Sequence, residues 1–209
     1  MSKVLVITSS ALADASASNS LVGDAVSRLR EADPDIEVIV RDLGANPIPH
    51  LGPDAALALG GGAPANDAQA AARELSDALV AELAGAETIV IGSPMYNFGI
   101  ASTLKAWFDH VLRAGITFRY TENGPEGLLR GKRAIVIETR GGIYADGPAQ
   151  TLDAQEPHLR ALLRFIGIED LVFIRAEGLA LGPAARSQAI ATAQTRVREV
   201  FGLDRRSAA

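Results

Sequence analysis

The chain has 209 residues, of which 48% are hydrophobic, with no cysteine and a formal net charge of −5. This length predicts a single domain over residues 1–209 with a core large enough to fold without disulfide bonds. The lack of cysteine excludes thiolate nucleophiles and cysteine-ligated metal sites, and the mild acidity argues against a nucleic-acid partner.

The N-terminal segment "MSKVLVITSS" predicts no export signal, because it lacks the long apolar region that such signals need. No stretch approaches the roughly 18 apolar residues that span a bilayer. A cysteine-free chain also fits a reducing compartment. We therefore expect a cytoplasmic protein with no membrane partner.

Apolar, β-branched runs alternate with stretches of helical spacing along the chain. The predicted strands are residues 3–8, 36–43, 87–92, 133–139 and 171–177. Leucine and aromatic spacing predicts helices around 21–29, 75–83, 104–111, 159–166 and 184–201. The alternation predicts an α/β fold with a doubly wound, five-stranded parallel sheet. With five strands legible, the flavodoxin-like order 2-1-3-4-5 is favoured over the six-stranded Rossmann order.

Two segments interrupt this alternation. Residues 44–66 are rich in Gly, Pro and Ala and predict a long, mobile connection. Residues 114–131, "AGITFRYTENGPEGLLRG", combine an alternating run with strong turn residues and predict a hairpin-like excursion before the fourth strand. The excursion is either surface decoration or part of a dimer interface or pocket wall, and spacing alone does not choose.

Hydroxyl side chains crowd the loop after the first strand, "TSSALADASASNS", and a helix follows. Ser and Asn cap helix N-termini, where free N–H groups and the helix dipole favour an anion. The alternative is a plain capping loop. The sequence lacks a G-x-x-x-x-G-K-[ST] motif and a G-x-G-x-x-G motif, so a terminal phosphate monoester suits this loop better than a triphosphate or a dinucleotide.

The loops after the third and fourth strands predict a site for a flat ring. "SPMYNFGI" (93–100) groups aromatics, a thioether and an amide, and "ETRGGIYADG" (138–147) contains a Gly-Gly pair that admits close approach of a ligand. Taken singly, the aromatics could be core and the glycines a tight turn. In this strand order all three loops are neighbours at the ligand-binding edge, and a phosphate with a planar ring describes FMN.

At these residues the sequence resembles the FMN-dependent NADH-azoreductase family, the NAD(P)H:quinone oxidoreductase-like flavoproteins. The matching stretches are "SSALADASASNS", the long segment 93–148 and "FIGIEDLVFIRAEGLALGP". By position, the resemblance implies a phosphate loop at Ser10, Ser16, Ala17 and Ser18. It implies ring contacts at Met95, Tyr96, Asn97, Phe98, Thr139, Arg140, Gly141, Gly142 and Tyr144.

The resemblance also implies a substrate pocket and a homodimer. Phe118 and Tyr120 are similar to residues that approach the partner subunit's site. Leu162 stands where some members carry a pocket-lining aromatic residue, and Tyr144 where some carry a histidine.

The activity implied is ping-pong transfer of two electrons from NADH or NADPH through FMN to a quinone or an aromatic azo compound. The flavin carries the chemistry, so no catalytic residue and no metal is expected. His110 is expected to be solvated or capping. Two other classes stay open: a flavodoxin-type carrier of single electrons, and a non-catalytic scaffold that ignores FMN.

Overall fold

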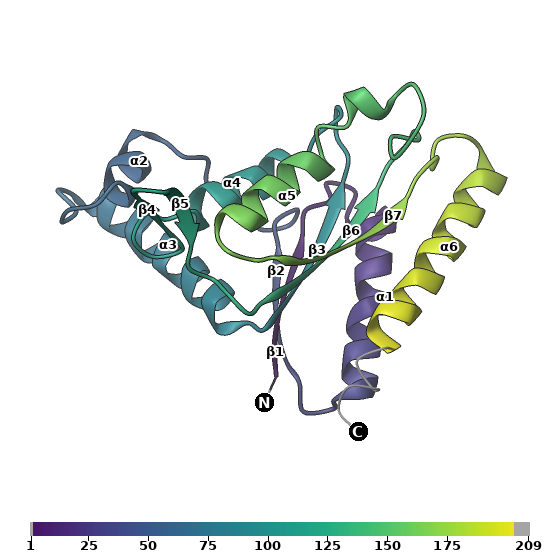
Figure 1. Cartoon of the computed structure of the whole chain (residues 1–209), viewed down its shortest axis with the longest axis horizontal. Helices are drawn as coiled ribbons and strands as arrows, with labels where there is room; N and C mark the ends of the chain where they lie inside the picture. The colour runs from purple at the N-terminus through teal and green to yellow at the C-terminus, as the bar shows by residue number, and fades with distance from the viewer. Residues whose placement is uncertain (1, 203–209) are drawn as a thin grey trace.

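A five-stranded parallel sheet forms the centre of the protein in a computed structural model that describes residues 2–202 (Figure 1). Its strands are β1 (Lys3–Thr8), β2 (Glu37–Asp42), β3 (Thr88–Pro94), β6 (Arg133–Thr139) and β7 (Asp170–Ala176). They lie in the order β2-β1-β3-β6-β7. Since β6 and β7 are the fourth and fifth strands of this sheet, the predicted order 2-1-3-4-5 is confirmed.

Helices cover both faces of the sheet. One face carries α1 (Ala17–Ala32) and α6 (Pro183–Gly202), which lie side by side in Figure 1. The other face carries α3 (Asp67–Gly85), α4 (Ser102–Val111) and α5 (Glu156–Phe165). Alternate residues of β1 point to opposite layers, with Val4 and Val6 in one apolar cluster and Leu5 and Ile7 in the other. This two-sided burial explains why the strands read as continuous apolar runs.

The segment 44–66 differs from the mobile connection that the sequence predicted, because it contains a helix, α2 (Pro53–Leu59). Pro53 occupies the first turn, where its missing N–H costs no hydrogen bond. Arg73 of α3 donates hydrogen bonds to the carbonyl oxygens of Ala58 and Gly62, and Asp54 accepts from Gln69. These bonds fasten the segment to α3. The glycines that suggested a loop flank the helix, and Pro53 lies in its first turn, where proline is tolerated.

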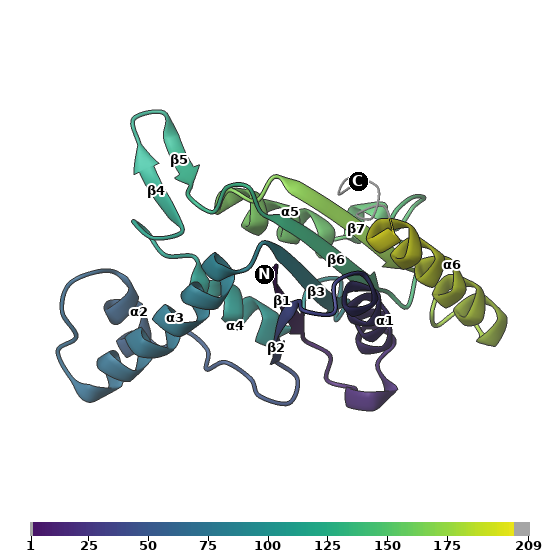
Figure 2. The same cartoon turned by 90° about the horizontal axis from the view of Figure 1, so that it is seen from below.

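The predicted excursion is a hairpin of β4 (Phe118–Thr121) and β5 (Gly124–Gly127), which pair antiparallel. It stands away from the rest of the molecule in Figure 2. Two contacts hold its base: the Phe118 ring lies 4.5 Å from the ring of Phe165, and the Leu129 N–H donates to the carbonyl oxygen of Ile166. Only the base of the hairpin is therefore part of the core.

Short 3-10 helices, η1 (Ala13–Ala15) and η2 (Gln150–Leu152), lie in loops between the longer elements. His110 is buried in α4, with Nε2 3.1 Å from the carbonyl oxygen of Pro49, so the expected solvated or capping role is wrong. No helix within residues 2–202 has the length and apolar character to cross a membrane.

Candidate cofactor site

Three loops meet where the central strands end. Strand register places Thr8 beside Gly92, and Pro94 beside Thr139. The Ser9 hydroxyl donates to the carbonyl oxygen of Gly92 at 2.9 Å, and the Met95 N–H donates to that of Thr139 at 2.8 Å. The loops after β1, β3 and β6 are thus held together at the sheet edge where open α/β sheets bind ligands.

A cavity of about 140 Å³ lies between these loops. It brings together eight of the predicted cofactor residues, from all three loops: Ser10, Ser16, Ala17, Met95, Tyr96, Thr139, Arg140 and Gly141. Its other lining residues, which sequence reasoning missed, are Leu12, Ala15, Pro94, Leu179 and Arg186. A second cavity of about 370 Å³ adjoins it across Tyr96 and is lined by the predicted Asn97.

The loop after β1, predicted to hold a phosphate, ends in the N-terminal cap of α1. Ser16 is the cap residue, and its hydroxyl accepts a hydrogen bond from the Asn19 N–H at 3.1 Å. Ser18 is fully buried, and its hydroxyl lies 3.0 Å from that of Ser16. The first turn of a helix has backbone N–H groups without carbonyl partners, and these favour an anion at the mouth of the cavity.

The loop after β3 closes in a tight turn with unusual backbone geometry. Asn97 and Phe98 have positive φ angles of 48° and 71°, a region that costs a non-glycine residue roughly 1–2 kcal/mol. Tyr96 and Gly99 exchange both backbone hydrogen bonds at 3.0 Å. The Ala154 N–H donates to the carbonyl oxygen of Phe98 at 3.0 Å, which fixes the turn from outside. Strain held in this way is typical of ligand-binding turns.

Tyr96 and Tyr144 border the site with fixed orientations. The Tyr96 hydroxyl accepts a hydrogen bond from the Ala11 N–H at 3.0 Å, which joins the loops after β1 and β3. The Tyr144 ring packs edge-on against the half-exposed Phe98 ring, with centroids 6.1 Å apart. A Cβ atom at Gly142 would lie 3.1 Å from the Tyr144 ring, so glycine lets that ring lie over the loop.

The Arg140 side chain lies inside a buried polar cage. Its guanidinium donates to Glu138 at 2.8 Å, to Glu177 at 3.0 Å and to the Gln155 amide oxygen at 3.0 Å. It also pairs with Asp153 at 3.1 Å. Arg140, Glu138 and Gln155 have no solvent exposure beyond about 1%. The guanidinium is therefore fully engaged, although the residue lines the cavity.

The cage connects the ends of β3, β6 and β7. The Gln155 amide N–H₂ donates to the carbonyl oxygen of Ser93 at 2.7 Å and to its hydroxyl at 3.1 Å. Glu177 accepts hydrogen bonds from the Tyr144 and Ala145 N–H groups at 2.8 and 3.0 Å. These links explain how a loop as polar as 138–147 keeps one conformation. No short sequence motif predicts these hydrogen bonds.

The carboxyl groups of the cage differ in their pKa values. Burial raises the pKa of Glu138 to about 8, against the opposing effect of Arg140. Burial also acts to raise the pKa of Glu156, but hydrogen bonds from Arg175 and Arg160 outweigh it and bring that pKa to about 2. At neutral pH Glu138 is therefore largely protonated and Glu156 is ionised.

The three residues predicted for the substrate pocket lie apart from the two cavities. Phe118 is buried at the base of the hairpin, whereas Tyr120 is 75% exposed on it. Leu162 of α5 is partly buried against the apolar core. None of the three lines either cavity within residues 2–202. The remaining predicted cofactor residues, Ser18, Phe98, Gly142 and Tyr144, line neither of the two cavities.

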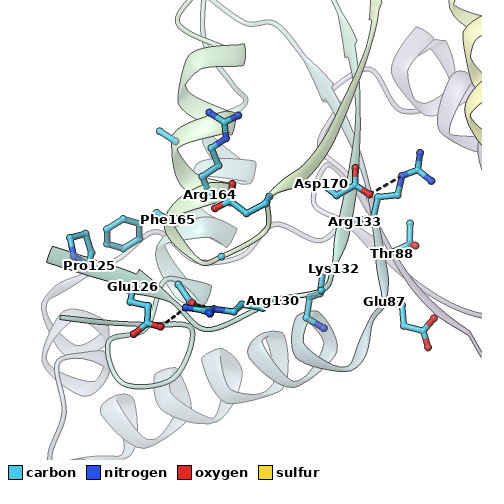
Figure 3. Close-up of a pocket in the computed structure, with 15 residues that line it drawn as sticks. Glu87, Thr88, Pro125, Glu126, Arg130, Lys132, Arg133, Arg164, Phe165 and Asp170 are labelled. Atoms are coloured by element: carbon cyan, nitrogen blue, oxygen red, sulfur yellow. Dashed lines mark hydrogen bonds and ion pairs between the residues drawn. The ribbon is translucent and has the colours of Figure 1, made fainter. Parts of the chain in front are cut away.

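The largest hollow, about 1160 Å³, lies at the opposite ends of the strands, between the hairpin and the starts of β3, β6 and β7 (Figure 3). Charged side chains of both signs line it, and ion pairs join Arg130 to Glu126 and Arg133 to Asp170 (Figure 3). Four cations and four carboxylates balance across this surface. Size alone therefore does not identify the chemical site.

Comparison with known proteins gives one consistent result. A family described as having a flavodoxin-like fold matches residues 2–201. An FMN-dependent NADH:quinone oxidoreductase of Azotobacter vinelandii is 51% identical over 203 residues, covering 96% of this chain and 100% of that protein. One of Hyphomonas neptunium is 50% identical over 96% of both chains. The crystal structure of an FMN-dependent NADH-azoreductase from Bacillus anthracis in complex with FMN has a TM-score of 0.89 at 28% identity, covering 97% of this chain and 98% of that one.

Proposed function

The chain belongs to the flavodoxin-like fold family, and from this premise we propose that it is an FMN-dependent NADH:quinone oxidoreductase that also reduces aromatic azo compounds. Relatives about half identical over nearly the whole chain bear the first name, and solved structures above 25% identity bear the second. This supports the enzyme over the single-electron carrier, which was the alternative from sequence.

FMN fits the residues around the smaller cavity, and that fit is the observation that carries the proposal. The first turn of α1, with the Ser10 and Ser16 hydroxyls, suits a phosphate monoester. The fixed turn at Asn97 and Phe98 and the backbone at Gly141 suit the edge of a flat ring. The thirteen residues that we assign to FMN are those named from the sequence: Ser10, Ser16, Ala17, Ser18, Met95, Tyr96, Asn97, Phe98, Thr139, Arg140, Gly141, Gly142 and Tyr144.

FMN when bound supplies the acceptance and release of two electrons. The chain's own residues hold and orient it. Tyr96 is fixed by the Ala11 N–H, and the loop at Tyr144 is fixed by Glu177, so both loops are preorganised. We assign no residue as a catalytic acid, base or nucleophile, and no metal.

The two substrates share one place in this proposal. NADH, and in principle NADPH, would bind against the open face of the site, leave, and be replaced by the quinone or azo compound. The adjoining cavity of about 370 Å³ beside Tyr96 and Asn97 offers room next to the flavin site. The acceptor can then bind only after the oxidised nicotinamide has left, because the two occupy the same place, and no residue has to move to set this order.

We further propose a single-domain protein that acts as a homodimer in the cytoplasm. The part of the hairpin beyond its docked base carries the exposed Tyr120 ring, and neither Phe118 nor Leu162 lines either of the two cavities at the cofactor end of the sheet. In a homodimer, Phe118, Tyr120 and Leu162 would face the partner's flavin and line its substrate pocket.

The experiment is an anaerobic titration of the purified protein followed by visible absorption. A bound flavin whose bands bleach with NADH in one two-electron step and return with benzoquinone is the expected result. A protein that takes up no added FMN would refute the assignment. Reduction in two separate one-electron steps would favour the electron carrier.

A further inference from the structure

The anion end of the flavin site lacks a cation in its own loop. Residues 8–20 contain no Lys or Arg, and their one charged residue is Asp14. A phosphate monoester carries nearly two negative charges at neutral pH. The N-terminus of α1 offers only about half a positive charge. A second source of positive charge would therefore strengthen binding at this end.

Two arginines line the cavity, but only one can supply that charge. The Arg140 guanidinium is buried and engaged by Glu138, Asp153, Gln155 and Glu177. Its charge is offset by these carboxyl groups inside the cage, and each of its three nitrogens already has a partner there. The other is Arg186.

Arg186 lies in the first turn of α6, and it is exposed. It lines the same cavity as Ser16 and Ala17 at the start of α1. α1 and α6 pack against each other, and both helices start toward the end of the sheet where the cavity lies (Figure 1). Within residues 2–202, Arg186 makes no ion pair and no side-chain hydrogen bond. Its guanidinium is thus available to an anion.

We propose that Arg186 recognises the phosphate of FMN and makes the site select a phosphorylated flavin over riboflavin. This rests on the proposed function, because it assumes that FMN binds in this cavity. A guanidinium can donate two parallel hydrogen bonds to phosphate oxygens. Its position on α6 adds a contact that is remote in sequence from the loops that hold the rest of the cofactor.

The test is a fluorescence titration of flavin-free protein with two probes, FMN and riboflavin. For Arg186→Gln we expect the Kd for FMN to rise about fivefold at low ionic strength, with the Kd for riboflavin unchanged. Added salt should weaken FMN binding to the original protein more than to the variant. Arg186→Lys should keep most of the affinity for FMN.

Arg198→Gln is the matched control, because Arg198 is an exposed arginine of the same helix that contacts Thr195 and not the cavity. It should leave both affinities unchanged. An equal loss for FMN and riboflavin in Arg186→Gln, or no loss for either, would overturn the proposal while the flavin function stands. If the original protein binds neither flavin, the proposed function itself fails and this inference with it.

Discussion

At the scale of single residues, the buried cage around Arg140 shows how charge is balanced beneath the site. Arg140, Arg160 and Arg175 face Glu138, Asp153, Glu156 and Glu177. Three positive charges face four carboxyl groups, so protonation of Glu138 leaves three positive and three negative charges. Burial raises the pKa of Glu138, so the folded chain holds the Glu138 proton more tightly than the unfolded chain does.

Glu138→Gln tests this proton through the pH dependence of stability. The pKa of Glu138 is raised from its ordinary value of 4.5 to about 8 by burial. Between those values the unfolded chain releases a proton that the folded one keeps, so Glu138 lowers stability as pH rises. The variant should gain about 3 kcal/mol over the original protein at pH 7 and little at pH 4, measured by denaturant unfolding.

The same substitution at the exposed Glu199 is the control, and it should change the free energy of unfolding little at either pH. A difference between Glu138→Gln and the original protein that stays constant from pH 4 to pH 8 would contradict a protonated Glu138.

Gln155 links two strand ends through both halves of its amide. Gln155→Leu leaves the Arg140 Nε and the Ser93 oxygens without a partner, and it should lower the free energy of unfolding by about 2–4 kcal/mol. Affinity for FMN should fall too, because the Ser93 end of β3 carries the turn at Asn97. Thermal unfolding and flavin titration measure the two effects.

Gln188→Leu, at an exposed position of α6, is the matched substitution and should change neither quantity by more than a small amount. If Gln155→Leu behaves like it, the cage does not position the loop.

At the scale of elements, the hairpin depends on two backbones that touch. A Cβ atom at Gly127 would lie 2.1 Å from the nitrogen of Gly167, which is rigid main chain. Gly127→Ala must therefore displace the hairpin from α5, and we expect a loss of about 2–3 kcal/mol in stability. Gly23→Ala, where nothing lies within 4 Å in the exposed middle of α1, should instead stabilise by about 0.5–1 kcal/mol. Chemical denaturation of both variants is the measurement, and equal effects would disprove the contact.

The sequence predicted elements well where periodicity was strong. All five sheet strands, the hairpin and the helices around Leu21, Leu79 and Leu104 follow from apolar spacing. The helix α2 was missed because its seven residues are too few for a period and are flanked by glycines. The loops of the site were predicted as neighbours because parallel strands end at one edge.

The cage and Arg186 could not be predicted, because both depend on contacts across long stretches of chain. Gln155 meets Ser93 over 62 residues, and Arg140 meets Glu177 over 37. Arg186 lies in an ordinary helical segment, and only the packing of α6 against α1 brings it to the cavity. Local sequence patterns do not predict contacts between residues that lie so far apart in the chain.

At the scale of the whole molecule, the hairpin is the part that a single subunit leaves unexplained. Tyr120→Ala should raise the KM for a quinone several-fold in the homodimer and leave the Kd for FMN unchanged. The reason is that, in the proposed homodimer, the exposed Tyr120 ring would line the partner's pocket, whereas in its own chain it lines neither of the two cavities at the cofactor end of the sheet. Steady-state kinetics and flavin titration separate the two. Loss of flavin with KM unchanged would show that the hairpin has been assigned the wrong role.

The pairing of α1 with α6 has a consequence for synthesis on the ribosome. One apolar cluster joins Val22 near the start of the chain to Val197 near its end. At roughly 5–20 residues per second, the first helix waits about 10–35 s before its last neighbour is made. Until then the apolar face of α1 that packs against α6 stays open to water and to other nascent chains. The cavity proposed to bind FMN, which Arg186 of α6 also lines, is completed only after α6 has been made, so cofactor uptake would follow the synthesis of that helix.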